Sequence, residues 1–346
     1  MVTHYIITNR EVTSRKSRNY IAVNDKEYMR KDGDEEARHN LRYGTVSFDP
    51  RKIKKLSDFK VNILPDVATE TLEKYAEGEA VNKKVFPSTQ IFEELYKSGV
   101  KAKEKEDILV FVHGFRNDLE AALVALGELH KKYVEPDDSP IQKIVLFTWP
   151  AKKKMLKYRS DAYDAEQSGF ALARSMGSLR EFFRQKFVAE KKPGCDQNIH
   201  LLCHSMGNRV LQSMISSLMA IEVPITNIFG QIILAAPDVD YDAMQEPKPL
   251  YKLIDLGQRV HVYFNNRDLA LEVSETTKNS FNRLGRWGAK KTDRLPDDVY
   301  ECDVTETSDA KGISNQVTNH SYFIASESVI EDIKAVLSGN SSIFNF

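Results

Sequence analysis

The chain has 346 residues, of which 41% are apolar, so it can bury a large core and is not a disordered protein. Lys and Arg number 49 against 50 Asp and Glu, and this balance gives no reason to expect nucleic acid as a partner. The 3 cysteines have no metal-ligand spacing, and their odd count argues against a disulfide framework. No apolar run reaches the roughly 18 residues that span a bilayer, and the opening MVTHYIITNREV lacks the pattern of a secretion signal. We therefore expect a soluble, cytoplasmic protein without a transmembrane segment.

The first third of the chain, residues 1–106, is polar. Residues 3–8 and 43–48 are patterned as strands, and 61–66 as another short one. The charged stretch DKEYMRKDGDEEARHN between the first two predicts an exposed loop or hairpin, and 87–106 predicts a helix. We expect the strands of this N-terminal extension to join the same sheet as the rest of the chain.

From residue 107 the pattern is regular, and 107–340 is expected to be the catalytic core. Apolar strands alternate with amphipathic helices, which predicts an α/β fold with a mostly parallel central sheet and helices on both faces. Right-handed crossovers then bring the loops after the strands to one edge, where such folds bind ligands. The expected strands are 108–115, 141–150, the short apolar run from Ile199 to Leu202, 230–240, 259–268 and 299–304. The expected helices are 118–134, 161–189, the segment after residue 207, and 322–337.

The stretch NIHLLCHSMGNRVLQSM, residues 198–214, is the most informative one. A short apolar strand leads into a tight turn with Ser205 at its tip, and a helix follows at once. This arrangement is typical of a nucleophile elbow, usually G-x-S-x-G, in which the serine projects above the sheet. Cys203 stands where the first glycine is usual, and we expect its small thiol to fit. Taken alone, Ser-x-Gly after a strand can also be a plain turn.

His113, Gly114 and Phe115 end an earlier buried strand. Gly114 allows a sharp turn there, so the N–H of Phe115 is expected to point into the site, together with the N–H of Met206 after the serine. Two such N–H groups would form an oxyanion hole. For the side chain of His113 we expect a supporting role, or none, rather than proton transfer.

An elbow serine needs a carboxylate and a histidine as partners. Asp268 follows the strand 259–268, whereas Asp238 and Asp240 end the strand before it. An Asp after a strand is often only a helix cap or turn residue. We favour Asp268 as the acid and keep Asp238 as the alternative.

His320, in SNQVTNHSYFI, is the histidine C-terminal to Asp268 and lies just before the last expected helix. A lone loop histidine commonly has no role. The chain order Ser205, Asp268, His320 nevertheless matches one of the orders in which serine hydrolases carry their triad, so His320 is the expected base.

These motifs resemble the α/β-hydrolase superfamily. FVHGFRND, FTWP, HSMGNRVL, LAAPDVD, NNRDLAL and TNHSYF are similar to a bacterial branch of the DUF900 type, α/β hydrolases of unknown function, over about residues 108 to 330. The resemblance implies the fold, Ser205 as nucleophile and His320 as base. Asp268 occupies the usual acid position of the superfamily, although some lipases take the acid one strand earlier. The resemblance implies no substrate.

Two further segments can shape specificity. The insertion 274–297 is expected to be a lid or rim, or else a solvated charged loop, and its Arg283, Arg286, Lys290, Lys291 and Arg294 would suit an anionic or acyl-phosphate substrate. In the segment 154–169, the side chains of Tyr158, Asp161 and Tyr163 either line the pocket or pack the helix, and we favour packing.

Together these features predict hydrolysis of an ester or thioester, of the carboxylesterase or lipase type, through an acyl-enzyme on Ser205. This chemistry requires no metal and no organic cofactor. The alternatives are a catalytically silent interaction module, and an acyltransferase or peptidase that uses the same triad.

Overall fold

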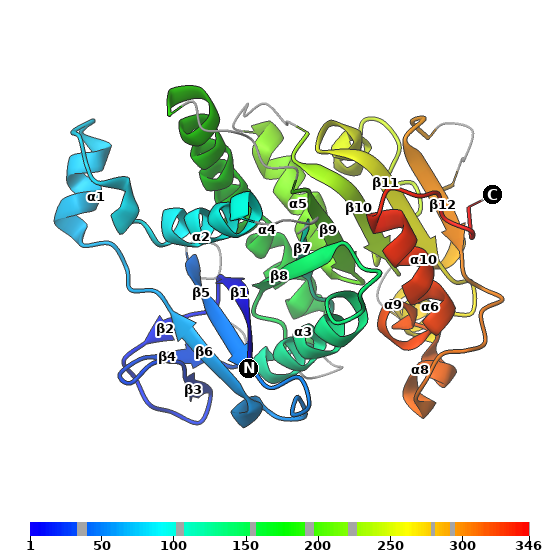
Figure 1. The fold of residues 1–346 in the computed structure, drawn as a ribbon. Coiled ribbons are helices and arrows are strands. Elements are labelled where there is room, and N and C mark those ends of the chain that lie inside the picture. The colour runs from blue at the N-terminus through cyan, green and yellow to red at the C-terminus, as the bar shows by residue number, and fades with distance from the viewer. Residues whose placement is uncertain are drawn as a thin grey trace.

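The computed structural model describes residues 1–32, 40–101, 107–152, 157–190, 197–220, 227–277, 281–290 and 295–345. In this part of the chain a nine-stranded sheet forms the centre of the molecule (Figure 1). From one edge to the other its strands are β12 (Val299–Asp303), β11 (Gly257–Phe264), β10 (Phe229–Ala235), β9 (Ile199–His204), β7 (Asp107–Val112), β8 (Ile141–Thr148), β1 (Val2–Thr8), β5 (Arg42–Phe48) and β6 (Phe59–Ile63).

Neighbouring strands are parallel from β12 through β1. At the other edge, β5 runs antiparallel to β1 and β6 runs antiparallel to β5. Every residue of β7 is buried, as expected for a strand covered on both faces. Its side chains alternate between two cores, because successive residues of a strand point to opposite faces. Val110 and Val112 belong to one core, whereas Leu109 and Phe111 belong to the other. The expected α/β architecture is confirmed.

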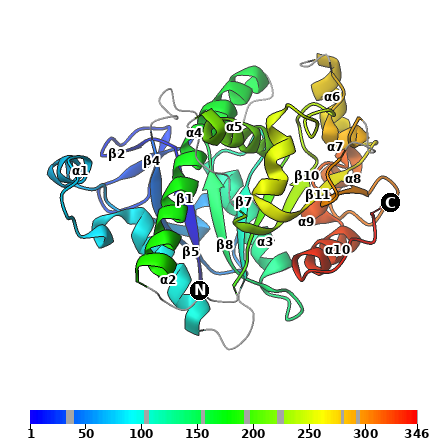
Figure 2. The same ribbon diagram turned by 90° about the horizontal axis from the view of Figure 1, so that it is seen from above.

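Helices cover both faces of the sheet. The helices α2 (Pro87–Lys101), α4 (Tyr158–Phe183) and α5 (Gly207–Ala220) supply apolar side chains to the first core. The helices α3 (Leu119–Tyr133), α9 (Tyr322–Ala325) and α10 (Glu327–Leu337) supply the second core. Figure 2 shows α4 beside α5, with α3 and α10 at the other face. None of the helices that the structure describes is both long enough and apolar enough to cross a membrane.

The N-terminal extension contributes β1, β5 and β6 to the main sheet. A second, three-stranded sheet consists of β2 (Val12–Thr13), β4 (Tyr28–Arg30) and β3 (Tyr20–Ala22). The whole of β4 lies within the charged stretch expected as a loop or hairpin. Residues 33–39 of that stretch lie outside the described part. The remaining α-helices of the described residues are α1 (Thr69–Ala76), α6 (Leu269–Thr277), α7 (Leu284–Trp287) and α8 (Ile313–Thr318).

The prediction of one helix over 322–337 is wrong. Ser326 is extended, with φ −96° and ψ 121°, and it separates α9 from α10. Its hydroxyl oxygen accepts a hydrogen bond from the N–H of Val329 and so caps α10. The apolar pattern continues across the break because both short helices face the same core, which is why periodicity alone misses it.

Candidate active site

Ser205 lies in a strained turn between β9 and α5. Its φ is +54°, a left-handed conformation that residues other than glycine rarely adopt. The backbone carbonyl of Ser205 accepts hydrogen bonds from the N–H groups of Asn208 (3.0 Å) and Asp238 (3.2 Å), and from the Asn208 side-chain amide (3.0 Å). The N–H of Ser205 donates to the carbonyl of Ala235 at 2.9 Å. These bonds hold a conformation that is otherwise unfavourable by about 1–3 kcal/mol, which is typical of functional turns.

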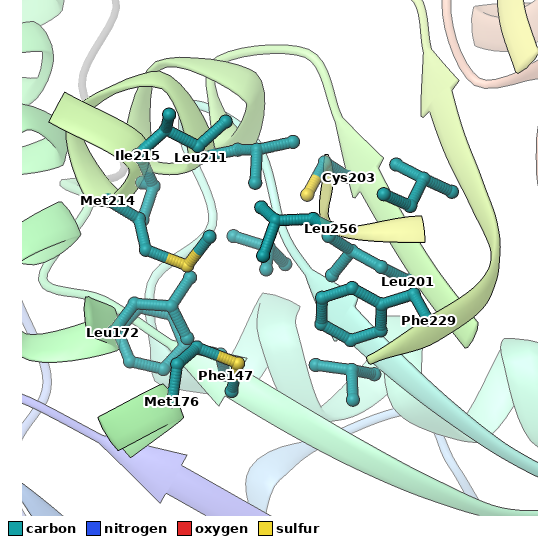
Figure 3. Packing of buried hydrophobic residues seen from close by; sticks show 14 of the residues in the cluster. Phe147, Leu172, Met176, Leu201, Cys203, Leu211, Met214, Ile215, Phe229 and Leu256 are labelled. Atoms are coloured by element: carbon teal, nitrogen blue, oxygen red, sulfur yellow. The ribbon is translucent and has the colours of Figure 1, made fainter. Parts of the chain in front are cut away.

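Two small residues allow the elbow to form. A Cβ added to Gly207 would lie 2.6 Å from the carbonyl oxygen of Val112, so the start of α5 packs directly on the end of β7. The side chain of Cys203 is fully buried among apolar side chains such as Leu201 (Figure 3). Burial raises the pKa of Cys203 well above its ordinary value. The thiol therefore behaves as a small core residue where a glycine is usual.

The loop after β7 lies against the elbow. A Cβ added to Gly114 would lie only 2.8 Å from the Cβ of Ser205, so a larger residue would push the two turns apart. Neither the N–H of Phe115 nor that of Met206 donates to a protein acceptor among the described residues. Both donors thus remain available at the turns that flank Ser205.

His113 braces this loop. The N–H of Trp149 donates to His113 Nε2 at 3.2 Å, so Nε2 carries no proton and Nδ1 donates to the carbonyl of Gly114 at 3.0 Å. The two rings stack, with centroids 5.3 Å apart and planes 12° apart, and the indole N–H donates to the backbone carbonyl of His113 at 2.8 Å. Burial lowers the pKa of His113 to about 3, and the charge of Arg10 adds to this shift. The imidazole is therefore neutral and occupied by backbone contacts.

Arg10 supports the same loop from the end of β1 and was not anticipated from the sequence. Its guanidinium is completely buried and donates to the carbonyls of Lys31 (2.7 Å) and Asn117 (3.0 Å) and to the hydroxyl of Thr148 (3.1 Å). An arginine after an apolar strand gives no sign in the sequence that it will be buried at the sheet edge.

The structure brings Asp268 and His320 together. Nδ1 of His320 lies 2.6 Å from Oδ2 of Asp268. The carboxylate is fully buried, and its other oxygen accepts from the N–H of Leu271 at 2.9 Å, at the start of α6. Asp268 is thus a helix cap and a histidine partner at once. With Nδ1 committed to Asp268, Nε2 of His320 is the nitrogen left to act as a proton acceptor.

The electrostatics of the pair favour a charged imidazole. Burial alone would lower the pKa of His320, but the charge of Asp268 and its hydrogen bond raise it by more, and the charge of Asp238 adds to them. The pKa of His320 therefore lies above its ordinary value of 6.5. Burial raises the pKa of Asp268, against the effect of His320 and of backbone N–H groups.

His204 connects the elbow to the loop of His320. Its Nε2 lies 3.2 Å from the backbone carbonyl of His320, so this nitrogen carries the proton. The His204 ring lies 4.8 Å from the His320 ring and 4.5 Å from that of Phe323, measured between centroids. Burial lowers the pKa of His204 well below its ordinary value, so the ring is neutral. Because His204 directly precedes Ser205, this contact brings the backbone of the predicted base to the elbow.

Asp238, the alternative acid, is also buried, but its carboxylate faces hydroxyl groups. The hydroxyl of Tyr158 donates to Oδ2 at 2.6 Å, and that of Ser274 to Oδ1 at 2.9 Å. The guanidinium of Arg283 lies 4.0 Å from Oδ1. Of the two candidate carboxylates, Asp268 is therefore the one bonded to His320.

The segment expected as a lid is partly anchored to the molecule. Arg283 is almost fully buried and pairs with Asp240 at 3.0 Å, and Arg286 pairs with Glu275 at 2.6 Å. The aromatic rings of Phe281 and Trp287 are exposed. Lys291 and Arg294 lie outside the described residues.

The segment at the start of α4 divides into two kinds of residue. Tyr158 and Asp161 are buried, whereas Tyr163 is 61% exposed. Asp161 accepts a hydrogen bond from the N–H of Lys152 at 2.9 Å, and burial raises the pKa of Asp161 to about 7. In the parts of the chain that the structure describes, no group of three or more His, Cys, Asp or Glu side chains is arranged to hold a metal ion.

The family assignment follows from comparison with known proteins. Residues 88–339 match the family described as "Alpha/beta hydrolase of unknown function (DUF900)". The chain belongs to this family. The expected resemblance and the α/β-hydrolase fold are thereby confirmed, and the match contains Ser205, Asp268 and His320.

One curated relative from Nostoc sp. (strain PCC 7120), described as "Uncharacterized protein alr1448", is 24% identical over 237 residues. The aligned stretch covers 54% of this chain and 59% of the relative, so the chain spans less than two thirds of that protein.

Proposed function

We propose that this DUF900 member is a serine hydrolase that cleaves carboxylic esters or thioesters through an acyl-enzyme on Ser205. The observation that carries the proposal is the 2.6 Å contact between His320 and Asp268 beside the strained elbow of Ser205. A buried carboxylate on Nδ1 fixes the tautomer in which Nε2 can accept the proton of a serine hydroxyl.

The reaction would run in two halves. Oγ of Ser205 attacks the carbonyl carbon while its proton moves to Nε2 of His320, and Asp268 stabilises the imidazolium. The N–H groups of Phe115 and Met206 hold the oxyanion, a contribution of about 3 kcal/mol for each donor. The C–O or C–S bond then breaks, and the proton passes from His320 to the leaving alcohol or thiol.

Water completes the cycle in the second half. His320 takes a proton from the water as the water oxygen attacks the acyl carbon, and it then gives that proton to Oγ of Ser205 as the acyl C–Oγ bond breaks and the carboxylic acid is released. An alcohol or an amine in place of water would make the same site an acyltransferase.

The direct test is turnover of p-nitrophenyl acetate and of a short thioester by the wild-type protein, S205A and S216A. Ser216 lies on the same helix, and its exposed hydroxyl donates only to the carbonyl of Gln212, so S216A is the matched control. We expect release of the acid with the wild type and S216A and none above background with S205A. Equal rates for S205A and the wild type would refute the assignment, and absence of turnover in all three would favour a silent interaction module.

A further inference from the structure

Asp238 is a second buried carboxylate at the edge of the sheet that carries Ser205, and the proposed reaction does not use it. It follows β10, and its backbone N–H donates to the carbonyl of Ser205 at 3.2 Å. Its carboxylate is held by the hydroxyls of Tyr158 and Ser274, from α4 and α6. A buried carboxylate is costly unless it is hydrogen-bonded, so this arrangement is strongly determined.

Tyr158 connects this carboxylate to the loop after β7. Its hydroxyl donates to Asp238, contacts Ser274 at 2.9 Å and accepts from the guanidinium of Arg209 at 3.2 Å. Its ring packs edge-on against the ring of Phe115, with centroids 5.4 Å apart and planes 70° apart. The position of the Tyr158 ring is therefore set at the hydroxyl, and the ring in turn supports Phe115.

Arg209 ties the same group of residues to the elbow. It lies in the first turn of α5, and its Nε donates to the backbone carbonyl of Asp238 at 3.0 Å. The backbone of Asp238 is thus bonded on one side to Ser205 and on the other to α5. Phe115 and Met206, the proposed oxyanion donors, belong to the two turns that this network joins.

We propose that Tyr158, anchored by Asp238, is a positioning residue that supports Phe115 and so keeps the two oxyanion donors aligned over Ser205. This role rests on the proposed function. Tyr158 would not touch the substrate. Because the oxyanion forms only in the transition state, misaligned donors should slow acylation without weakening binding of the uncharged substrate.

The key variant is Y158F, which removes one oxygen atom and keeps the ring beside Phe115. We expect kcat/KM for p-nitrophenyl acetate to fall about tenfold to a hundredfold, because small displacements of catalytic groups have effects of this size. The affinity for a trifluoromethyl ketone, which forms a tetrahedral adduct with an active serine, should fall by the same factor. The affinity for a non-reactive ether analogue of the ester should stay unchanged.

Y163F is the matched control, because Tyr163 lies on the same helix and is exposed. It should behave as the wild type in all three measurements. Thermal unfolding followed by circular dichroism reports whether each variant is folded. If Y158F does not fold, S274A replaces it: this variant removes the other hydroxyl from the same carboxylate and should change the three readouts in the same direction.

A double-mutant cycle with D238N separates positioning from a general loss of packing. If Tyr158 acts through Asp238, kcat/KM of the Y158F/D238N protein should be no lower than that of the more impaired single variant. Each variant is assayed on the alkaline plateau of its own pH–rate profile, so that a change in the pKa of His320 on loss of the Asp238 charge does not affect the comparison.

Three results would overturn the positioning role. The first is wild-type kinetics in Y158F, and the second is an equal loss of affinity for the ketone and for the ether analogue. The third is a double variant in which the two reductions in kcat/KM multiply. A wild-type protein that neither turns over the ester nor binds the ketone would instead contradict the proposed function.

Discussion

Asp268 and His320 lie 52 residues apart in the chain, yet the Asp268 carboxylate and the His320 imidazole meet at 2.6 Å. Two loops at the same edge of the sheet make this possible. Asp268 follows β11 and begins α6, whereas His320 follows α8 and precedes α9. The residue before His320, Asn319, has a left-handed φ of +51°, which turns the loop sharply at this point.

The two roles of Asp268 can be separated by substitution. D268N keeps an oxygen that can cap α6, so its thermal stability should stay close to that of the wild type. Because an amide cannot stabilise the imidazolium, kcat/KM for the ester should fall by between about 100-fold and about 10,000-fold. D268A should lose the same activity and a further ~1 kcal/mol of stability through the missing cap. Wild-type activity in a folded D268N protein would remove Asp268 from the proposed triad.

The pH dependence follows from the raised pKa of His320. The imidazole must be neutral to accept a proton, so kcat/KM should rise with pH and level off above the pKa of His320. Since Asp268 raises that pKa, the midpoint of the acidic limb should lie above 6.5. A pH–rate profile from pH 5 to pH 9 measures it. A midpoint below 6.5 would contradict the observed pairing.

The sequence predicts those parts of the site that local chain geometry determines. The elbow of Ser205 and the turn at Gly114 each follow a buried strand, and strand ends of a parallel sheet necessarily meet at one edge. What the sequence leaves open is the direction of each side chain at that edge. Asp238 and Asp268 each follow a strand, and this position alone does not tell them apart. Only tertiary packing places a histidine beside Asp268 and two hydroxyl groups beside Asp238.

His204 offers a test of how the base is held in place. H204F keeps a ring against Phe323 but removes the N–H that donates to the carbonyl of His320. One hydrogen bond is worth about 1 kcal/mol, so we expect kcat/KM to fall roughly fivefold to tenfold. H204Q retains an N–H donor, so its kcat/KM should fall by less than that of H204F. Equal rates in H204F and the wild type would show that the contact does not position His320.

His261 should make the protein sensitive to acid. It is buried in β11 beside Gln231, and burial lowers its pKa from 6.5 to about 3. The folded protein keeps this ring neutral, whereas the unfolded chain protonates it below pH 6.5. Its contribution to stability is therefore complete above pH 6.5 and is lost as the pH falls towards 3, by about 1.4 kcal/mol per pH unit.

Urea unfolding at pH 6.5 and pH 5.5 measures this effect. H261Q cannot take up the proton, so its free energy of unfolding should fall by about 1 kcal/mol less than that of the wild type between pH 6.5 and pH 5.5. The comparison uses the difference between pH values, so any loss of packing in H261Q cancels. An equal decrease in the free energy of unfolding in both proteins would show that folding does not keep His261 neutral.

The contacts that the sequence does not predict are those between buried polar side chains. Arg10, Tyr158 and His204 are each separated along the chain from the groups they bind, and no pattern in the sequence specifies these partners. Arg10 follows β1, where the apolar run of the strand has ended and polar residues are usually solvated, whereas Tyr158 is the first residue of α4. Their burial depends on several loops meeting at once, which no single segment encodes.

Covalent labelling tests the central proposal most directly. The wild-type protein is treated with a fluorophosphonate, digested with a protease, and the modified residue is located by mass spectrometry, with S205A and S216A treated in parallel. We expect one phosphonylated serine, Ser205, in the wild type and in S216A, and none in S205A. A folded wild-type protein that stays unlabelled, or one that is labelled at another serine, would contradict the assignment of Ser205 as an activated nucleophile.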